Sequence, residues 1–161
     1  MSKSSYSYSF LKGIVICHGK SEKLICEFLR SNLRIQIEID SDKKGKKSIQ
    51  ITSIMKFLSG EKYKNIASFK NKFDDIEQIK DKKKLPSYFK IFIIMDTDDC
   101  NENQKKSFKD KSMFKEHWLY DYIVPIYNDS NLEEVLVDAG IKFQKSGNER
   151  KTEYPKVFPM N

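Results

Sequence analysis

Two short runs rich in β-branched residues, GIVICH at 13–18 and KIFIIMD at 90–96, constrain the fold of this chain more than any other feature. Continuous apolar runs of this length are typical of strands that are buried on both faces, as in a parallel sheet. Between and after them, apolar residues recur at helical spacing. Strands that alternate with helices predict an α/β fold, with a mainly parallel, Rossmann-like sheet of about four strands flanked by helices.

The remaining elements follow from periodicity and from glycine and proline positions. Residues 34–40 alternate between apolar and polar, which predicts a half-buried strand near a sheet edge. Residues 123–127 predict another edge strand, because Pro125 has no N–H to donate to a neighbour. Residues 98–111 fit either a loop or a short exposed helix, and residues 113–122 could be helical. Further helices are expected from an N-cap at Ser21 through Leu29 and over 51–58, 66–79 and 131–139, followed by an unassigned tail at 142–161.

Length and composition favour one domain spanning residues 1–161, with a core at about 13–139. The 161 residues carry 30 Lys+Arg against 23 Asp+Glu, a net charge of +7. This charge fits an anionic partner or a lysine-rich codon bias equally well. The three cysteines form no C-x-x-C pair and are expected to be reduced thiols. No apolar run approaches the roughly 20 residues of a membrane span, so we expect a cytoplasmic protein with no membrane partner.

Acidic residues crowd the end of the second apolar run. Asp96 is the last residue of this run, and Asp98 and Asp99 follow within the next three positions. Functional residues of open α/β sheets collect at the carboxyl ends of the strands. Carboxylates at such close spacing repel each other unless a cation neutralises them, and hard oxygen ligands suit Mg²⁺ or Mn²⁺. The alternative is an acidic turn that caps the next helix.

The first apolar run also ends in polar residues, His18, Lys20, Ser21 and Glu22. Together, residues 14–22 (IVICHGKSE) and residues 91–98 (IFIIMDTD) resemble the Toprim domain, a metal-binding α/β module of topoisomerases, primases and OLD-family nucleases. The pattern is nearest to OLD-family and small Toprim-like phage-defence proteins. Residues 131–136 (NLEEVL) match the helix that begins after a later strand in that group, so the resemblance covers most of residues 13–139.

The resemblance implies metal-assisted phosphodiester chemistry on DNA or RNA. Asp96 and Asp98 would hold one ion, with Asp99, Glu133 and Glu134 as possible further acids. His18 or Glu22 would transfer the proton. Lys20 would bind phosphate at the start of the first helix, unless it is simply a solvated loop lysine.

One departure from the family pattern concerns His18, which stands where the family has Glu. Histidine exchanges protons near neutral pH and binds Mn²⁺, Fe²⁺ or Zn²⁺ better than Mg²⁺. The replacement therefore changes the preferred metal, leaves Glu22 to act alone, or marks a site that has lost catalysis.

Several alternatives stay open beside the nuclease hypothesis. A catalytically degenerate nucleic-acid-binding or regulatory protein on the same fold is the first, and a protein-interaction module is the second. A partner subunit or a homodimer could complete the site. Gly19-Lys20-Ser21 is not a P-loop, because Ile14 stands where the first glycine of that motif belongs. Lysine clusters in expected loops could contact a nucleic-acid backbone or be solvated: Lys43, Lys44, Lys46, Lys47, Lys82, Lys83 and Lys84.

Overall fold

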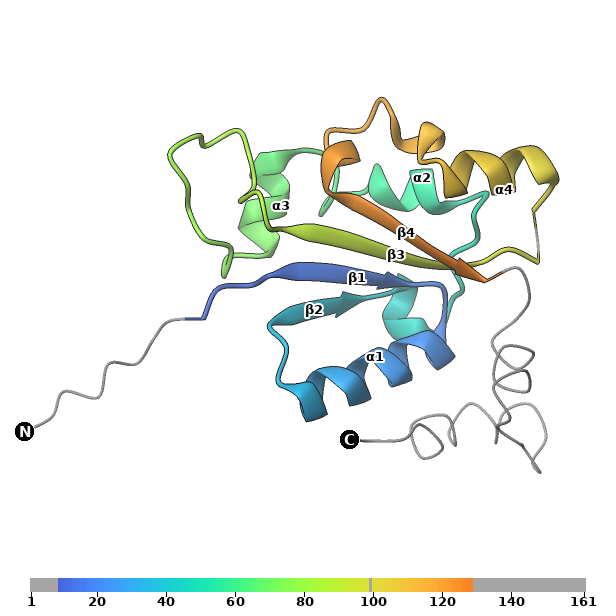
Figure 1. Cartoon of the computed structure of the whole chain (residues 1–161), viewed down its shortest axis with the longest axis horizontal. Helices are drawn as coiled ribbons and strands as arrows, with labels where there is room; N and C mark the ends of the chain where they lie inside the picture. The colour runs from blue at the N-terminus through green and yellow to red at the C-terminus, as the bar shows by residue number, and fades with distance from the viewer. Residues whose placement is uncertain (1–8, 99, 129–161) are drawn as a thin grey trace, which may run out of the picture.

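A single all-parallel sheet organises the described part of the chain. The computed structural model describes residues 9–98 and 100–128. Within them, four strands lie in the order β2-β1-β3-β4 (Figure 1). Their bounds are β1 Gly13–Cys17, β2 Ile37–Asp40, β3 Lys90–Asp96 and β4 Ile123–Asn128. The α/β fold with a parallel, Rossmann-like sheet of four strands is thereby confirmed.

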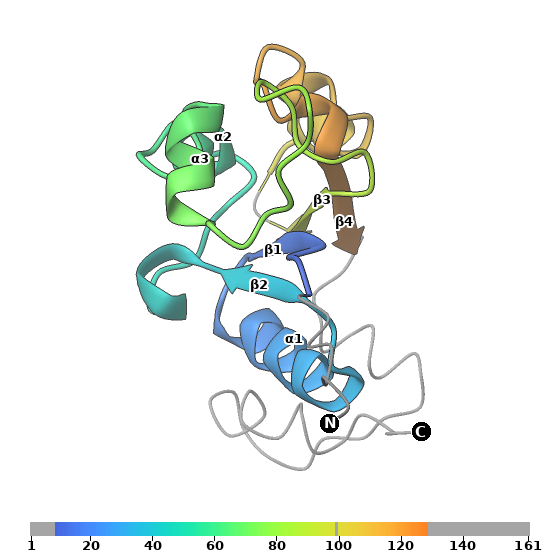
Figure 2. The same cartoon turned by 90° about the vertical axis from the view of Figure 1, so that its left-hand side faces the viewer.

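The helices flank both faces of the sheet, with α1 on one face and α2, α3 and α4 on the other (Figures 1 and 2). This distribution follows from the strand order. The connection from β1 to β2 runs toward one edge, the later connections run toward the other edge, and right-handed crossovers then use opposite faces. The helices are α1 Lys20–Leu33, α2 Ile54–Leu58, α3 Ile66–Lys72 and α4 Glu102–Lys109, with short 3₁₀ turns η1 Asp42–Gly45, η2 Ser112–Phe114 and η3 Tyr120–Tyr122.

Both expected edge strands lie at sheet edges. Among the described residues, β2 pairs only with β1, and β4 pairs only with β3. Pro125 of β4 lies opposite Ile93 of β3. Because β4 is an edge strand, the missing N–H of Pro125 removes no hydrogen bond to a second neighbouring strand. The strand expected over residues 34–40 is shorter than predicted. Arg34 adopts a left-handed conformation (φ 53°) that ends α1, so the strand begins only at Ile37.

Helix boundaries differ from the predictions at three places. The prediction of Ser21 as N-cap was wrong, because Gly19 is the N-cap of α1 and Ser21 lies buried in its first turn. α2 begins at Ile54, after a turn at residues 51–53. α3 ends at Lys72, although Phe73 and Ile76 are buried in the core beyond it. The spacing of apolar residues indicates which side chains are buried. It does not show where a helix ends, because residues of the following loop can also bury their side chains in the core.

The two segments left open in the sequence have defined structures. α4 is a short helix whose capping box joins Asn101 and Gln104 through reciprocal side-chain hydrogen bonds. Residues 113–122 form 3₁₀ turns rather than an α-helix. Cys17, Cys26 and Cys100 form no disulfide with one another. None of the helices in residues 9–98 and 100–128 is long and apolar enough to cross a membrane. The helix predicted over 131–139 and the tail at 142–161 lie outside the described residues.

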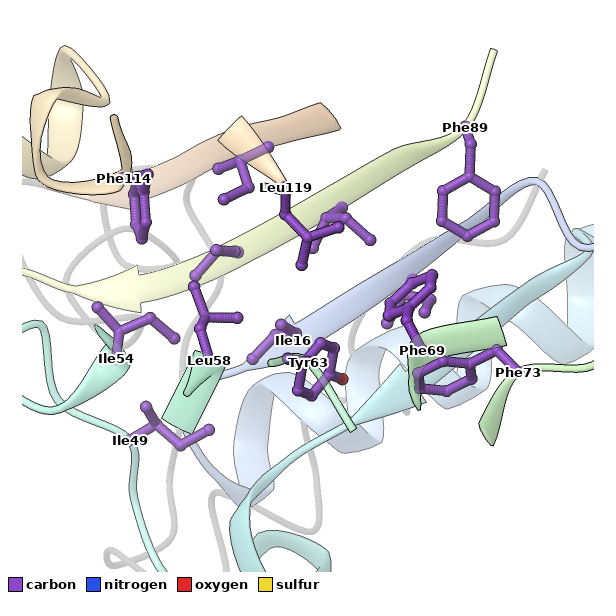
Figure 3. Close-up of a cluster of buried hydrophobic side chains, with 14 of the residues drawn as sticks. Ile16, Ile49, Ile54, Leu58, Tyr63, Phe69, Phe73, Phe89, Phe114 and Leu119 are labelled. Atoms are coloured by element: carbon purple, nitrogen blue, oxygen red, sulfur yellow. The ribbon is translucent and has the colours of Figure 1, made fainter. Parts of the chain in front are cut away.

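The main core lies between the sheet and the α2–α4 layer (Figure 3). Ile14, Ile16, Ile91 and Ile93 point into it from the two central strands and are completely buried. A cluster of aromatic side chains packs against these isoleucines and completes this core. Phe69 lies at its centre, with ring centroids between 4.9 and 6.0 Å from those of Tyr63, Phe73, Phe89 and Trp118.

Candidate functional site

The carboxyl ends of β1 and β3 lie side by side in the middle of the sheet. Cys17 is in register with Ile94, and the N–H of His18 donates to the carbonyl of Ile94 at 3.0 Å. From these two ends the chain departs in opposite directions, toward β2 and toward β4. This is the topological switch point, where open α/β sheets bind their ligands. His18 and Asp96, expected from the sequence to be functional, both lie here.

His18 is held on both its backbone and its ring by Ile49. The carbonyl of His18 accepts a hydrogen bond from the N–H of Ile49 at 2.7 Å, and the ring Nδ1 lies 2.7 Å from the carbonyl of Ile49. A carbonyl oxygen can only accept, so Nδ1 carries the hydrogen in this contact. In the neutral ring Nε2 therefore keeps its lone pair, which suits it to accept a proton or to bind a metal.

Asp96 is half-buried at the end of β3 and surrounded by charged groups. Burial raises the pKa of the Asp96 carboxyl above its ordinary value, and the nearby charge of Asp98 raises it further. The N–H of Asp98, which donates to Asp96 Oδ1 at 3.3 Å, and the ring of His18 both lower this pKa, whereas Glu22 raises it. His18, Glu22 and Asp98 therefore all lie within electrostatic reach of Asp96 at one edge of the sheet.

Glu22 and Lys20 belong to the first turn of α1. The Glu22 carboxylate folds back toward Gly19, since its Oε2 lies 3.7 Å from the position that a Cβ would occupy there. Gly19 has no side chain to cap the helix, so no side chain of the N-cap residue accepts a hydrogen bond from the first N–H groups of α1. Lys20 is exposed beside them. A helix start of this kind attracts an anionic group such as phosphate.

The described acids fit a hard divalent cation in their chemistry but do not complete its ligand set. The raised pKa of Asp96 indicates negative charge that a cation would stabilise. Within residues 9–98 and 100–128, however, no three His, Cys, Asp or Glu side chains lie close enough to hold a metal by themselves. Asp99, Glu133 and Glu134 lie outside the described residues, so their predicted roles stay predictions.

A cavity of about 400 Å³ opens next to His18, on the side of β2. Ser48 and Ile49, which adjoin Gly19 and His18, form one wall. Phe57 and Tyr63 contribute aromatic surface. Lysines supply positive charge around it: Lys47, Lys56 and Lys62. Two acids, Asp42 and Glu61, also line the cavity, so it combines apolar surface with both signs of charge.

One wall of this cavity is braced by Asp40, at the end of β2. Its carboxylate accepts hydrogen bonds from the Tyr63 hydroxyl at 2.5 Å and from the Lys62 ammonium at 2.8 Å. Burial and the charge of Asp40 raise the pKa of Tyr63 well above its ordinary value, so the hydroxyl remains a donor. Lys62 is therefore largely committed to Asp40, and the Lys47 ammonium lies 3.9 Å from the carboxylate of Asp42 in a long ion pair.

Sequence reasoning missed the residues that orient the site. Ile49 acts through its backbone, and backbone contacts between distant segments leave no pattern in the sequence. The Asp40–Tyr63 pair joins residues that are 23 positions apart and was not expected either. No family model, no curated protein and no solved structure matches this chain.

The raised pKa of Asp96 predicts a pH-dependent effect of Asp96→Asn. A carboxyl that binds its proton more tightly in the folded state loses stabilising free energy as pH rises through its folded pKa. We therefore expect Asp96→Asn to be more stable than the wild type at pH 7 in metal-free buffer. The difference should vanish below the ordinary Asp pKa of about 4, where the wild-type carboxyl is also neutral.

Urea unfolding at both pH values, followed by the fluorescence of the single tryptophan, Trp118, measures this effect. Asp74→Asn, an exposed acid after α3, is the matched control and should show no such pH dependence. Equal stability of Asp96→Asn and the wild type at pH 7 would contradict the electrostatic description of the site.

Proposed function

We propose that this chain is a divalent-metal-dependent nucleic-acid-processing protein, a Toprim-type phosphodiesterase or nuclease of a defence or mobile-element system that works in the cytoplasm. The observation that carries the proposal is the meeting of His18, Glu22, Asp96 and Asp98 at the switch point between β1 and β3. The resemblance of residues 14–22 and 91–98 to Toprim motifs supports the same assignment, since both motifs end at this edge.

Each residue of the site has a role in this proposal. Asp96 and Asp98 would hold Mg²⁺ or Mn²⁺, with Asp99, Glu133 and Glu134 as accessory acids. The ion would supply Lewis acidity toward a phosphate oxygen. β4 ends at Asn128, in register with Asp96 and five positions before Glu133. The end of this strand beside Asp96 supports an accessory role for the two glutamates.

Groups around β1 and α1 would accept the proton and bind the phosphate. Nε2 of His18, left with its lone pair by the contact of Nδ1 with Ile49, would accept a proton from the attacking water. Glu22 is the alternative base. The start of α1 and Lys20 would bind a phosphate of the substrate, and Lys47 and Lys56 would contact the strand along the adjoining cavity.

Cleavage of end-labelled single- and double-stranded DNA and RNA tests the proposal, with Mg²⁺, Mn²⁺ or a chelator present. We expect cleavage only with a divalent cation. Asp96→Asn and Asp98→Asn should lower its rate about 10²-fold or more, because a preorganised electrostatic group is typically worth this much. Asp74→Asn should cleave like the wild type. Cleavage that survives both site substitutions, or that proceeds in chelator, would overturn the assignment of Asp96 and Asp98.

A second candidate is a nucleic-acid-binding protein on the same fold that does not cleave. It is favoured by His18 in place of the family glutamate and by the incomplete ligand set among the described residues. Binding that weakens steeply with salt, without cleavage under any metal, would identify this function. Absence of binding even at low salt would instead point to a protein-interaction module.

A further inference from the structure

The two faces of the sheet are unequally covered. On the face toward α2, α3 and α4, Ile91, Ile93 and Met95 are at most 1% exposed. Side chains of a strand alternate between faces, so Phe92 and Ile94 point to the opposite face. Both are only half-buried, and Ile126, in register with Ile94, is 40% exposed. We call this second surface the α1 face, because the Cys17 thiol contacts Cys26 of α1 there. It consists of Val15, Cys17, Phe92, Ile94, Val124 and Ile126.

One helix cannot cover this face. α1 packs on β1 and β2 (Figure 2), and it buries Val15 and Cys17 to 7% and 0% exposure. A helix with its side chains is about 10–12 Å wide, whereas neighbouring strands lie about 4.8 Å apart. A single helix therefore shields about two strands. Parallel strands are normally buried on both faces. The described residues thus leave the β3–β4 half of the α1 face without its second layer.

We propose that residues 131–139 of this chain dock on the β3–β4 half of the α1 face as an amphipathic helix. The sequence supplies a matching apolar stripe at positions i, i+3, i+4 and i+7, namely Leu132, Val135, Leu136 and Ala139. Gly140 can end the helix. These residues lie outside the described part of the chain.

The place where the chain leaves the sheet supports this occupant. β4 ends at Asn128, at the carboxyl edge of the sheet, so only two residues of chain, 129 and 130, separate this edge from residue 131. On the other face of β4, that space is already filled by α4 and the following turns, whose Phe108, Phe114 and Leu119 are completely buried. A nine-residue helix is about 14 Å long, and β3 runs for about 23 Å. The segment can therefore turn back along β4 and remain on the sheet.

A double-mutant cycle in the full chain tests the docking. Ile126→Asp on the sheet and Leu136→Asp in the segment should each lower the urea midpoint and raise the binding of an apolar dye. Together they should lower the midpoint by clearly less than the sum of the single shifts, because both remove the same contact. Val137→Asp, which lies off the apolar stripe, is the matched control and should leave the midpoint nearly unchanged.

Three results would overturn the proposal. Leu136→Asp could act no more strongly than Val137→Asp, or the two site substitutions could simply add. A wild-type dimer that Ile126→Asp converts to monomers, measured by light scattering, would show that a second copy covers this face. Should the Asp variants fail to fold, Ile94→Ala and Leu136→Ala form the same cycle with smaller perturbations. The proposed metal ligands Asp96 and Asp98 belong to β3 and the residues after it, so their role does not depend on this docking, which bears only on the accessory acids Glu133 and Glu134.

Discussion

His18→Ala is expected to lower the rate of the proposed metal-dependent cleavage by about 10²–10⁴-fold, the usual contribution of a positioned general acid or base. The ring is held by the carbonyl of Ile49 at Nδ1, so in the neutral ring the free lone pair is on Nε2. Alanine removes that proton acceptor, while the backbone hydrogen bonds of His18 to Ile94 and Ile49 remain. Single-turnover cleavage with Mn²⁺ measures the loss.

The other histidine provides the control for this experiment. His117 also contacts a backbone carbonyl through its ring, with Nε2 2.9 Å from the oxygen of Leu58, but it lies among the 3₁₀ turns that follow α4. His117→Ala should cleave at the wild-type rate per folded molecule. If His18→Ala is equally active, Glu22 is the base, and Glu22→Gln should then abolish cleavage. A His18→Glu variant more active than the wild type would identify a partly decayed site.

Phe69→Ala is expected to lower the free energy of unfolding by about 3–5 kcal/mol, the range for deleting a fully buried aromatic ring. Phe69 is 0% exposed, and its ring meets Phe89 and Trp118 edge to face at 6.0 and 5.4 Å. Truncation leaves a cavity that the surrounding rings can close only in part. Because a domain is stable by only about 5–15 kcal/mol, this single change removes a large share of the total.

Urea unfolding followed by Trp118 fluorescence measures this loss directly, since the indole packs on Phe69. Tyr88→Ala is the comparison at the surface. Tyr88 is 38% exposed, and its hydroxyl donates to Glu77 at 2.7 Å. Its replacement should cost at most about 1 kcal/mol, as surface substitutions usually do. A similar cost for both variants would contradict the position of Phe69 at the centre of the core.

The strands were more predictable than the helices. The runs at 13–18 and 90–96 became the two central strands, because a strand buried on both faces must be apolar throughout. Pro125 and the apolar–polar alternation before Asp40 predicted the two edge strands of the sheet, because each is a property of a short stretch of sequence. Helix ends were less predictable. α3 ends at Lys72 while the apolar spacing continues to Ile76, because the same core buries side chains from the loop that follows.

The candidate site was predictable in its residues but not in its geometry. Acids after one strand and a histidine after another could be found by inspection of the sequence. That His18 presents Nε2 depends on Ile49, 31 residues away, through a carbonyl that any residue type would provide. The cavity depends in the same way on Asp40, Lys62 and Tyr63, which only the fold brings together.

By itself, the sequence determined the class of fold, the central and edge strands, and the polar residues at the strand ends. These properties depend on local periodicity and on the chemistry of single residues. Only the tertiary structure decided that β1 and β3 are neighbours, which brings His18 and Glu22 within electrostatic reach of Asp96. It also decided which face of the sheet the described residues leave half covered. Strand order and crossover direction are properties of the whole chain, and no local segment encodes them.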